Sequence, residues 1–481
     1  MAENISQNFR GKKVLVFGLG LLGGGVATTN WLIKHGARVT VTDLKSENYL
    51  EPSLRRLKGK PRLRLNGHDK KDIEDNEIIV FNPDVSVNNP FVKYARKIGR
   101  QVENEATIFY KLCPPRPIIA VTGTRGKTTT ANWIGYFLNR AKREAVITGN
   151  SYVEPLLKTL DLIKPYLPKP SSPPTVFSNS QEFENTVRLK SGMEQDGGSW
   201  IVNEIPSYHL EFFNKEVPVP KVAIITNIYR DHLNRYKSFE DYARTKAKIF
   251  ENQTERDNLI LNYDNSWTKF LLKLKPRAQV WFFSTGRLPK GRDGIFVKDG
   301  FAYFQFDDGS GHPVFRVIKF VERWGEHNLE NLLASALAAH LAGVFWGPIA
   351  RSIGVNGKKI PQIQFRQETI FDGSAKLTTK NSRLRIVNDT AATSPDGGIA
   401  AINRFSNFGG KGWWGRPDRS EVILITGGTD RQLEYGQWAQ VVLRKLKPEN
   451  VIFLSGSATV KMINALGWDS GNQVFDTLER C

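Results

Sequence analysis

A glycine turn, Ala120-Val-Thr-Gly-Thr-Arg-Gly-Lys-Thr-Thr129, holds the residues whose types and spacing best suit phosphate chemistry. It follows an apolar run, Ile118–Val121, and leads into a helical pattern, Thr129–Leu138. A strand, a turn and a helix in this order form a cradle whose backbone N–H groups hold phosphate oxygens. Lys127 can place a positive charge on the phosphates, and the Thr128 hydroxyl can bind Mg²⁺. The sequence predicts a shortened phosphate-binding loop; the alternative is a plain glycine turn with an exposed lysine.

A second turn, Gly18-Leu-Gly-Leu-Leu-Gly23, also follows a strand pattern, and Asp43 ends the next strand pattern. This spacing is typical of dinucleotide-binding folds, in which such an acidic residue contacts a ribose. Many sheets use the same turn for tight packing or for another nucleotide, so these alternatives stay open from the spacing alone.

Asp231 and His232 follow a third strand pattern, Val222–Thr226. They lie where α/β sheets bind ligands, beyond the carboxyl end of a strand. An Asp-His pair is more often a loop contact than a metal site, so the pair alone decides nothing.

The helix predicted after this pair presents a lysine, Lys246, on an apolar face. Ser238 is predicted to cap the helix, with Asp241 reaching back. A lysine in such a position is costly unless it reaches solvent or is used chemically, and the spacing leaves both possibilities open. The residues that share its face are Tyr242, Ile249 and Phe250.

Alternating strand and helix patterns must position these residues, and they predict an α/β protein with parallel, doubly wound sheets. A proline-rich break at Cys113–Pro117 ends the first predicted domain. The predicted domains are residues 1–113, 114–361, with a surface insertion at about 164–199, and 362–481. The main patterns outside the motifs are strands at Lys13–Gly18, Arg38–Thr42, Glu77–Phe81, Leu384–Val387, Glu421–Thr426 and Val451–Leu454, and helices at Gly23–His35 and Leu329–Ala350.

The composition describes a soluble globular protein of 481 residues, 40% hydrophobic and 24% charged. Two cysteines, Cys113 and Cys481, argue against a disulfide framework and for a reducing compartment. The first ten residues lack the apolar core of a signal peptide, and no apolar stretch is suited to span a membrane, so we expect a cytoplasmic protein. The net charge of +20 favours acidic partners such as nucleotides, but no motif of a nucleic-acid binder accompanies it.

Taken in order, the motifs resemble those of the Mur ligases, the peptidoglycan-building family to which folylpolyglutamate synthases are related. The resemblance runs from about Gly11 to the C-terminus and implies a Rossmann-like N-terminal domain, a central P-loop ATPase-like domain and a C-terminal Rossmann-like domain. The motifs that carry it are TGTRGKT at 122–128, Asn150 in TGN, Glu204 in NEIPSYHLE, RDHLNRY at 230–236, Lys246 in YARTKAKIFEN, GEHNLEN at 325–331, Arg366, and VNDT at 387–390.

The resemblance implies an ATP-dependent ligase that forms an amide bond through an acyl phosphate. Within the family, the Gly18–Gly23 turn with Asp43 is most similar to members that join glutamate to UDP-N-acetylmuramoyl-L-alanine. We expect a monomer with no nucleic-acid partner. The alternatives are a related ligase with another amino acid or acceptor, and an NAD-dependent oxidoreductase.

The resemblance also implies roles for individual residues. Lys127, His232, Lys246 and Asn150 are implied as catalytic, with Asn150 near the reacting carboxylate. ATP binding is assigned to Gly123, Thr124, Arg125, Gly126, Lys127, Thr128, Thr129, Asn328, Asn331, Arg366 and Asp389. Binding of the uridine diphosphate part is assigned to Gly18, Leu19, Gly20, Leu21, Leu22, Asp43 and Leu44. Two Mg²⁺ ions are assigned to Thr128, Glu204, His232 and a carbamylated Lys246, and the incoming amino acid to Thr393 and Arg431.

The chain departs from the family pattern near the expected amino-acid site. Ala391 and Arg431 each stand where a lysine is usual, and Phe365 stands where a histidine is usual. These changes resemble a divergent branch that includes ligases adding L-glutamate, so the enantiomer stays open. The family continues beyond Val474–Arg480 with another strand and helix, so we expect the sequence to be a fragment; the alternative is a protein that lacks part of the acceptor site.

Overall fold

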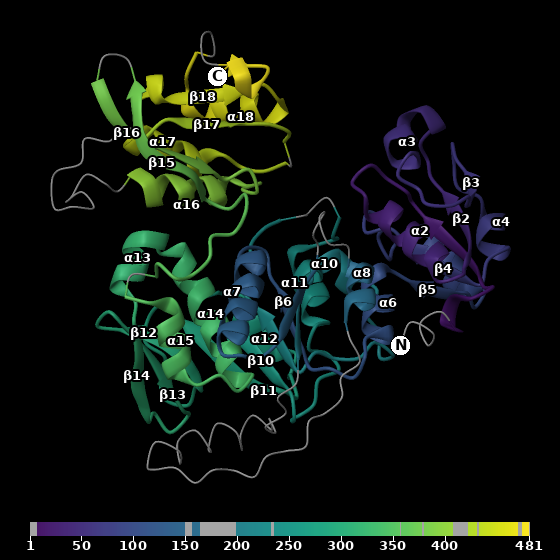
Figure 1. Ribbon diagram of the computed structural model, residues 1–481, viewed down its shortest axis with the longest axis horizontal. Coiled ribbons are helices and arrows are strands. Elements are labelled where there is room, and N and C mark those ends of the chain that lie inside the picture. Colours follow the sequence, from purple (N-terminus) through teal and green to yellow (C-terminus); the bar gives the residue numbers. More distant parts are fainter. Residues whose placement is uncertain are drawn as a thin grey trace. The chain divides into compact units, whose positions relative to one another are not determined.

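The computed structural model describes residues 7–149, 156–163, 199–231, 235–355, 357–377, 380–406, 422–430, 432–469 and 474–480 (Figure 1). Asn150, His232, Arg431 and almost all of the predicted insertion lie outside these ranges. The chain forms two compact units. Unit 1 comprises Met1–Val317 and Glu330–Gly354, and unit 2 comprises Ile318–Leu329 and Val355–Cys481.

The first sheet of unit 1 is parallel, with strand order β3-β2-β1-β4-β5. The chain leaves β1 for β2 on one side and later returns to β4 on the other, so the strand order reverses at β1. Ligands of doubly wound folds bind at such a point, and the Gly18–Gly23 turn follows β1 directly. Its elements are β1 (Lys13–Phe17), α2 (Gly24–Lys34), β2 (Arg38–Thr42), α3 (Glu47–Leu54), β3 (Arg62–Arg64), α4 (Lys70–Glu74), β4 (Ile78–Phe81), α5 (Pro90–Lys97), β5 (Gln101–Glu103) and α6 (Glu105–Leu112).

The second sheet of unit 1 has nine strands among the described residues, in the order β14-β13-β12-β11-β10-β9-β6-β8-β7. Its strands are parallel from β7 to β12 along this order, and β13 and β14 add an antiparallel edge. Its elements are β6 (Ile118–Thr122), α7 (Lys127–Arg140), β7 (Ala145–Thr148), α8 (Leu156–Leu162), β8 (Trp200–Glu204), α10 (Ser207–Leu210), β9 (Val222–Ile225), α11 (Phe239–Ala247), β10 (Asn258–Asn262), α12 (Thr268–Lys273), β11 (Gln279–Ser284), β12 (Gly294–Lys298), β13 (Phe301–Gln305) and β14 (Gly311–Arg316).

The apolar stretch Leu329–Ala350 is two helices, not the single buried helix predicted from the sequence. The first is α14 (His327–Leu341) and the second α15 (Trp346–Ile353). Gly343 separates them in a left-handed conformation, with φ 88°, which glycine adopts without the strain of a Cβ atom.

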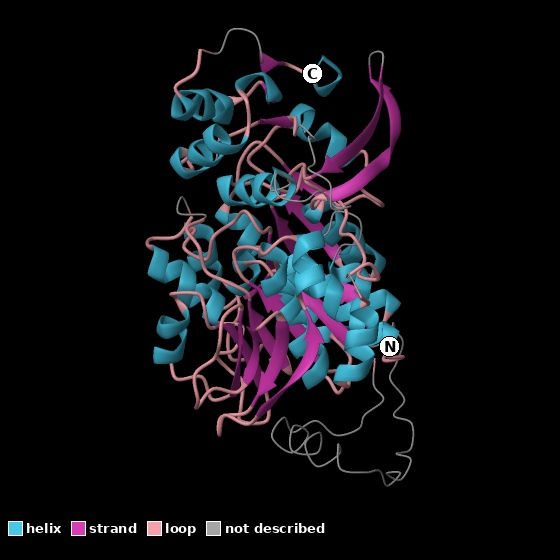
Figure 2. Cartoon of the chain, turned by 90° about the vertical axis from the view of Figure 1, so that its left-hand side faces the viewer, coloured by secondary structure: helices cyan, strands magenta, loops and turns pink. Residues whose placement is uncertain are grey.

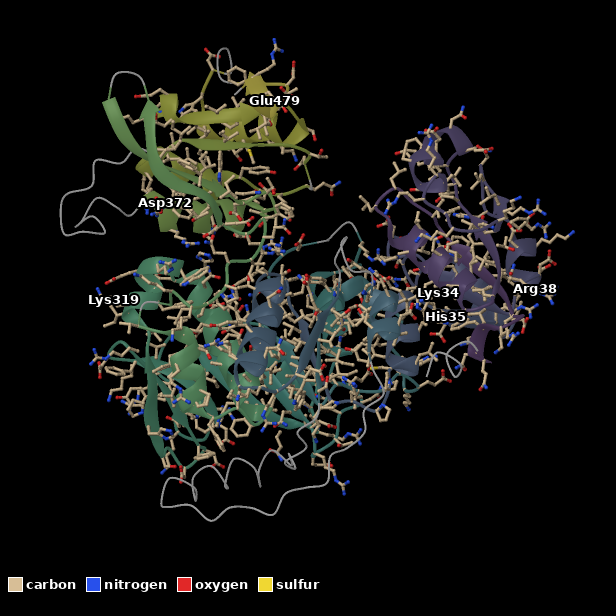
Figure 3. All side chains as sticks on the ribbon, viewed as in Figure 1. Lys34, His35, Arg38, Lys319, Asp372 and Glu479 are labelled. Carbon is tan, nitrogen blue, oxygen red and sulfur yellow. The ribbon has the colours of Figure 1, made fainter. Side chains whose placement is uncertain are left out.

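A polar contact within unit 1 joins α2 to α8. The Asp161 carboxylate accepts from His35 Nε2 at 3.0 Å and from Trp31 Nε1 at 3.3 Å. Lys34, labelled with His35 in Figure 3, donates to the same carboxylate at 2.5 Å. This contact ties the layer of helices on the first sheet to a helix of the second.

Unit 2 combines an antiparallel hairpin with a parallel sheet of order β17-β18-β19. The predicted strand Leu384–Val387 lies in the hairpin, whose two long curved strands are visible in Figure 2, and not in the parallel sheet. The predicted strand Val451–Leu454 is confirmed as β18. The elements are α13 (Ile318–Trp324), β15 (Glu368–Leu377), β16 (Lys380–Asn388), α16 (Pro395–Ser406), β17 (Leu424–Gly427), α17 (Gly436–Lys445), η1 (Pro448–Asn450), β18 (Val451–Leu454), α18 (Ser457–Leu466), β19 (Val474–Phe475) and η2 (Leu478–Arg480).

No helix within the described ranges combines the length and apolarity that a membrane crossing requires.

Candidate active site

The phosphate-type turn lies between the end of β6 at Thr122 and the start of α7 at Lys127. Gly126 has φ 79°, and a Cβ atom there would lie 2.1 Å from Asn331 Oδ1. At Gly123 a Cβ atom would lie 1.9 Å from Thr226 Oγ1. Both positions therefore require glycine, because the turn passes directly against neighbouring side chains.

The loop after β9 holds the turn in place. The backbone N–H of Thr124 donates to Asn227 O at 2.9 Å, and that of Arg125 donates to Asn227 Oδ1 at 2.8 Å. Thr226 Oγ1 donates to Arg125 O at 2.6 Å. The turn is preorganised by contacts across the sheet, so a ligand that enters it meets a backbone already in place.

The turn places two positive groups together, the N-terminus of α7 and the Lys127 ammonium group. Gly126 caps α7 in a left-handed conformation, without a side-chain cap and without an acidic residue in the first turn. Lys127 Nζ donates to Thr124 O at 3.1 Å, so its ammonium group lies over the turn. A helix N-terminus and a lysine combined in this way suit an anion.

Lys246 is buried, with an exposed fraction of 1%, so its side chain does not reach solvent. Its Nζ donates to Gly123 O at 2.8 Å and lies 4.6 Å from the centre of the Tyr242 ring. Burial lowers the pKa of the Lys246 ammonium group far below its ordinary value, and the charges of Lys127 and Arg125 lower it further. Asp231 acts in the opposite direction. Burial and both neighbouring cations therefore disfavour the charged form of Lys246.

The predicted cap of α11 is present with one difference. Ser238 Oγ accepts from the backbone N–H of Asp241 at 3.1 Å. The Asp241 carboxylate reaches back to Lys237 N, at 3.2 Å, and not to Ser238. The residues predicted to share the face of Lys246, which are Tyr242, Ile249 and Phe250, are all buried, although α11 itself ends at Ala247.

Asp231 pairs with the phosphate-type turn through an ion pair that the sequence did not reveal. Its Oδ2 atom lies 2.9 Å from Arg125 Nη1. The two residues are 106 positions apart, so only the pairing of β6 with β9 brings them together. The ion pair holds Arg125 at the edge of the turn.

Glu204 ends β8, the strand next to β6, and lies opposite Val121 in the parallel register. The turn and Glu204 thus emerge side by side from adjacent strands. Thr128 and Glu204 offer the oxygen ligands that Mg²⁺ prefers. Within the part of the chain that the structure describes, no group of three or more His, Cys, Asp or Glu side chains is arranged to hold a metal.

Asn331 lies against the turn and not on an open surface. Its exposed fraction is 8%, and its Oδ1 accepts from Thr130 Oγ1 at 3.4 Å. Asn328 belongs to unit 2, where its Nδ2 donates to Trp324 O at 2.9 Å.

Unit 2 brings Arg366 and Asp389 together. Phe365 and Gln367, on either side of Arg366, have φ of 63° and 47°, a strained conformation for such residues. Gln367 N donates to Asp389 Oδ1 at 3.0 Å. Burial raises the pKa of the Asp389 carboxyl to about 6, while the charges of Arg366 and Arg404 lower it. Strain of this kind concentrates at functional sites.

Two of the positions that depart from the family pattern are neighbours in space. Ala391 N donates to Phe365 O at 3.0 Å, so the residues that replace the usual lysine and histidine lie against each other. Thr393 is exposed, two residues before α16.

In the first sheet, Asp43 organises the glycine turn that follows β1. Its Oδ2 accepts from Leu19 N at 2.8 Å and from Gly20 N at 3.0 Å, and its Oδ1 accepts from Lys45 N at 2.9 Å. The carboxylate therefore uses its oxygens on the backbone of two loops.

Around this turn the structure exposes apolar side chains that a ligand could cover. Leu21, Leu22 and Leu44 are 41%, 68% and 66% exposed. The Arg56 guanidinium lies beside Gly23, 2.9 Å from the position that a Cβ atom would occupy. Sequence reasoning missed Arg56, because only the packing of the loop after α3 brings it to the start of α2.

We expect Asp43→Ala to lower the free energy of unfolding by about 2 kcal/mol, because backbone N–H groups lose a charged acceptor in a partly buried loop. Chemical denaturation would measure the change. Asp84→Ala, in an exposed loop of the same sheet, is the matched control and should stay near wild type. Equal stability of both variants would contradict the role given to Asp43.

Comparison with known proteins identifies two family matches. Residues 12–103 match the family described as "Mur ligase MurD-like, N-terminal domain", and residues 121–339 match "Mur ligase middle domain". The chain is similar to "UDP-N-acetylmuramoylalanine--D-glutamate ligase" of Roseiflexus sp. (strain RS-1), with 32% identity over 95% of this chain and 86% of that protein. The protein of the same name from Clostridioides difficile (strain 630) is 30% identical over 88% and 79%. Among solved structures, "MurF ligase from Thermotoga maritima in complex with ADP" covers 98% of this chain and 86% of that one, at 15% identity and a TM-score of 0.49.

Proposed function

Because this chain belongs to the Mur ligase family, we propose that it is an ATP-dependent ligase that adds glutamate to UDP-N-acetylmuramoyl-L-alanine. The observation that carries the proposal is the buried contact of Lys246 Nζ with Gly123 O, which places the amine against the phosphate-type turn. Burying a charged lysine side chain is costly, so its burial beside the turn favours a chemical use of the amine.

The phosphate-type turn binds the phosphates of ATP in this proposal. Its backbone N–H groups and the N-terminus of α7 face the phosphate oxygens, and Lys127 adds a charge that a transferring phosphoryl group requires. The oxygens of Thr128 and Glu204 suit Mg²⁺. His232 and a carbamylated Lys246 would complete two sites. Bound Mg²⁺ ions would supply neutralisation of charge on that phosphoryl group.

The surroundings of Lys246 favour its carbamylation. In its neutral form the amine attacks carbon dioxide, so that an Nζ–C bond forms as one C=O π bond opens, and a water molecule that enters with carbon dioxide takes up one N–H proton. Arg125 and Lys127, which disfavour the ammonium ion, stabilise the carbamate anion by their charges. The same two cations thus oppose one form of the side chain and support the other.

The reaction proceeds in two steps. A carboxylate oxygen of the acceptor attacks the γ-phosphorus of ATP, the bond to ADP breaks, and an acyl phosphate forms. The amino group of glutamate then attacks the acyl carbon, and inorganic phosphate leaves with its bonding electrons. On this proposal Asn150 acts near the reacting carboxylate, and Thr393 and Arg431 bind the glutamate.

The first sheet is the natural place for the uridine diphosphate group. The glycine turn of β1 lies where the strand order reverses, with exposed apolar side chains around it. On this proposal residues 1–113 bind the uridine nucleotide and 114–361 bind ATP, while 362–481 contribute Arg366 and Asp389 to ATP and Thr393 and Arg431 to the amino acid. We propose that the protein acts in the cytoplasm as a monomer.

Release of phosphate from ATP tests the function. Purified protein should release phosphate only when UDP-N-acetylmuramoyl-L-alanine and glutamate are both present, and D- and L-glutamate should be supplied separately. The relatives carry D-glutamate in their names, so the D form is expected to react, whereas activity with L-glutamate alone would fit the changes at Ala391 and Arg431. No stimulation by either form, or binding of NADH instead, would overturn the proposal.

A further inference from the structure

Arg404, in the last turn of α16, is a charged side chain of unit 2 to which no family motif assigns a task. We propose that Arg404 is a positioning residue for ATP, which holds the turn carrying Arg366 and the segment Arg323–Asn328 in one arrangement. The inference rests on the proposed function, since it takes Arg366, Asp389 and Asn328 as nucleotide contacts.

Its guanidinium group bridges two segments that are distant in the sequence. Nη1 donates to Gln367 Oε1 at 3.1 Å, on a residue 37 positions away. Nε and Nη2 donate to Arg323 O at 3.1 Å and 2.8 Å, on a residue 81 positions away. A planar fork of fixed donors can make both contacts at once, which a lysine ammonium group cannot reproduce.

The segment on one side of this bridge contains Asn328, one of the residues that the family resemblance assigns to ATP. The Arg404 guanidinium lies 5.4 Å from the centre of the Trp324 ring, and Trp324 O accepts from Asn328 Nδ2. A Cβ atom at Gly325 would be in ordinary van der Waals contact with Arg404 Cβ, at 3.5 Å. Arg404 therefore packs on this segment as well as bonding to it.

The segment on the other side is the strained turn around Arg366. Asp389 holds Gln367 by its backbone N–H, and Arg404 holds the same residue by its side chain. A left-handed glutamine persists only where its surroundings determine it. Phe365 and Arg366 are held by their own backbone bonds, whereas Gln367 loses its side-chain hydrogen bond when Arg404 is removed.

The charge of Arg404 supports the same role. Burial and the nearby charges of Arg323 and Arg385 lower the pKa of its guanidinium to about 10, so it stays positive at neutral pH. That charge, with the charge of Arg366, favours the ionised form of Asp389, the form suited to accept hydrogen bonds from a ribose.

Steady-state kinetics of the full-length chain with Arg404→Gln and Arg404→Lys test the inference. We expect the KM for ATP to rise about 10-fold in both variants, because charged hydrogen bonds are lost, while kcat and the KM for glutamate change little. Removing the charge raises the pKa of Asp389 further, so in Arg404→Gln the acidic limb of kcat/KM for ATP should move to higher pH. In Arg404→Lys the charge remains, and the limb should stay near that of wild type.

Two further variants keep the test decisive. Arg444→Gln, on the exposed face of α17, is the matched control and should keep all wild-type constants. Gln367→Met removes only the acceptor of the Arg404 bond and should raise the KM for ATP even if Arg404 variants fold poorly. An unchanged KM for ATP in both Arg404→Gln and Gln367→Met would overturn the inference. Absence of phosphate release by the wild-type protein would instead overturn the proposed function.

Discussion

Lys246→Ala is expected to lower ATP-dependent phosphate release by roughly a thousand-fold or more, because an anionic metal ligand beside the phosphates would be lost. The amine lies 2.8 Å from Gly123 O, so a carbamate on it would lie against the turn proposed to bind ATP. The side chain is buried, and alanine in its place removes both the charge site and a packed aliphatic stem. A thermal denaturation curve for each variant would separate loss of activity from loss of fold.

Chemical rescue distinguishes the carbamate from a purely structural lysine. Short-chain carboxylic acids should restore part of the activity of Lys246→Ala, since they can occupy the place of the carbamate oxygens. Lys248→Ala is the matched control, because Lys248 donates to Glu211 O at 2.7 Å and has no contact with the turn among those observed. Unchanged turnover in Lys246→Ala would show that the metal site is assigned to the wrong residues.

Lys127→Met is expected to lower kcat by roughly 100- to 1,000-fold, since one preorganised positive group would be missing where charge develops. Methionine keeps an unbranched apolar stem, and the loop retains its bonds to Asn227, so the fold should persist. Steady-state assays of phosphate release would give kcat. Isothermal titration calorimetry with a nonhydrolysable ATP analogue would give the Kd for the nucleotide.

For Lys127→Met, the comparison of kcat with nucleotide affinity decides the role of the lysine. Lys269→Met, on the exposed side of α12, is the control and should match wild type. If Lys127→Met weakened nucleotide binding and left kcat intact, Lys127 would contribute to ground-state binding only. Arg125 would then be the residue that neutralises charge on the phosphoryl group.

Contiguous features were predicted well from the sequence. The strand, turn and helix around residues 118–138 are local, so their patterns are complete within one window. The helical period likewise identified the face of α11 on which Lys246 lies, and that face is buried. The helix at Leu329–Ala350 was misjudged because apolar residues continue across the break, and only the conformation of Gly343 ends α14.

The family motifs and the residue types of the phosphate-type turn were thus determined by the sequence alone. The tertiary structure decided which groups contact each other. Arg125 forms an ion pair with Asp231, Lys246 donates to Gly123 O, and Asp43 accepts from Leu19 N. It also decided that the strand at Leu384–Val387 pairs in an antiparallel hairpin. A partner 100 residues away leaves no trace in local periodicity, since contacts of this kind arise only when strands pair and helices pack.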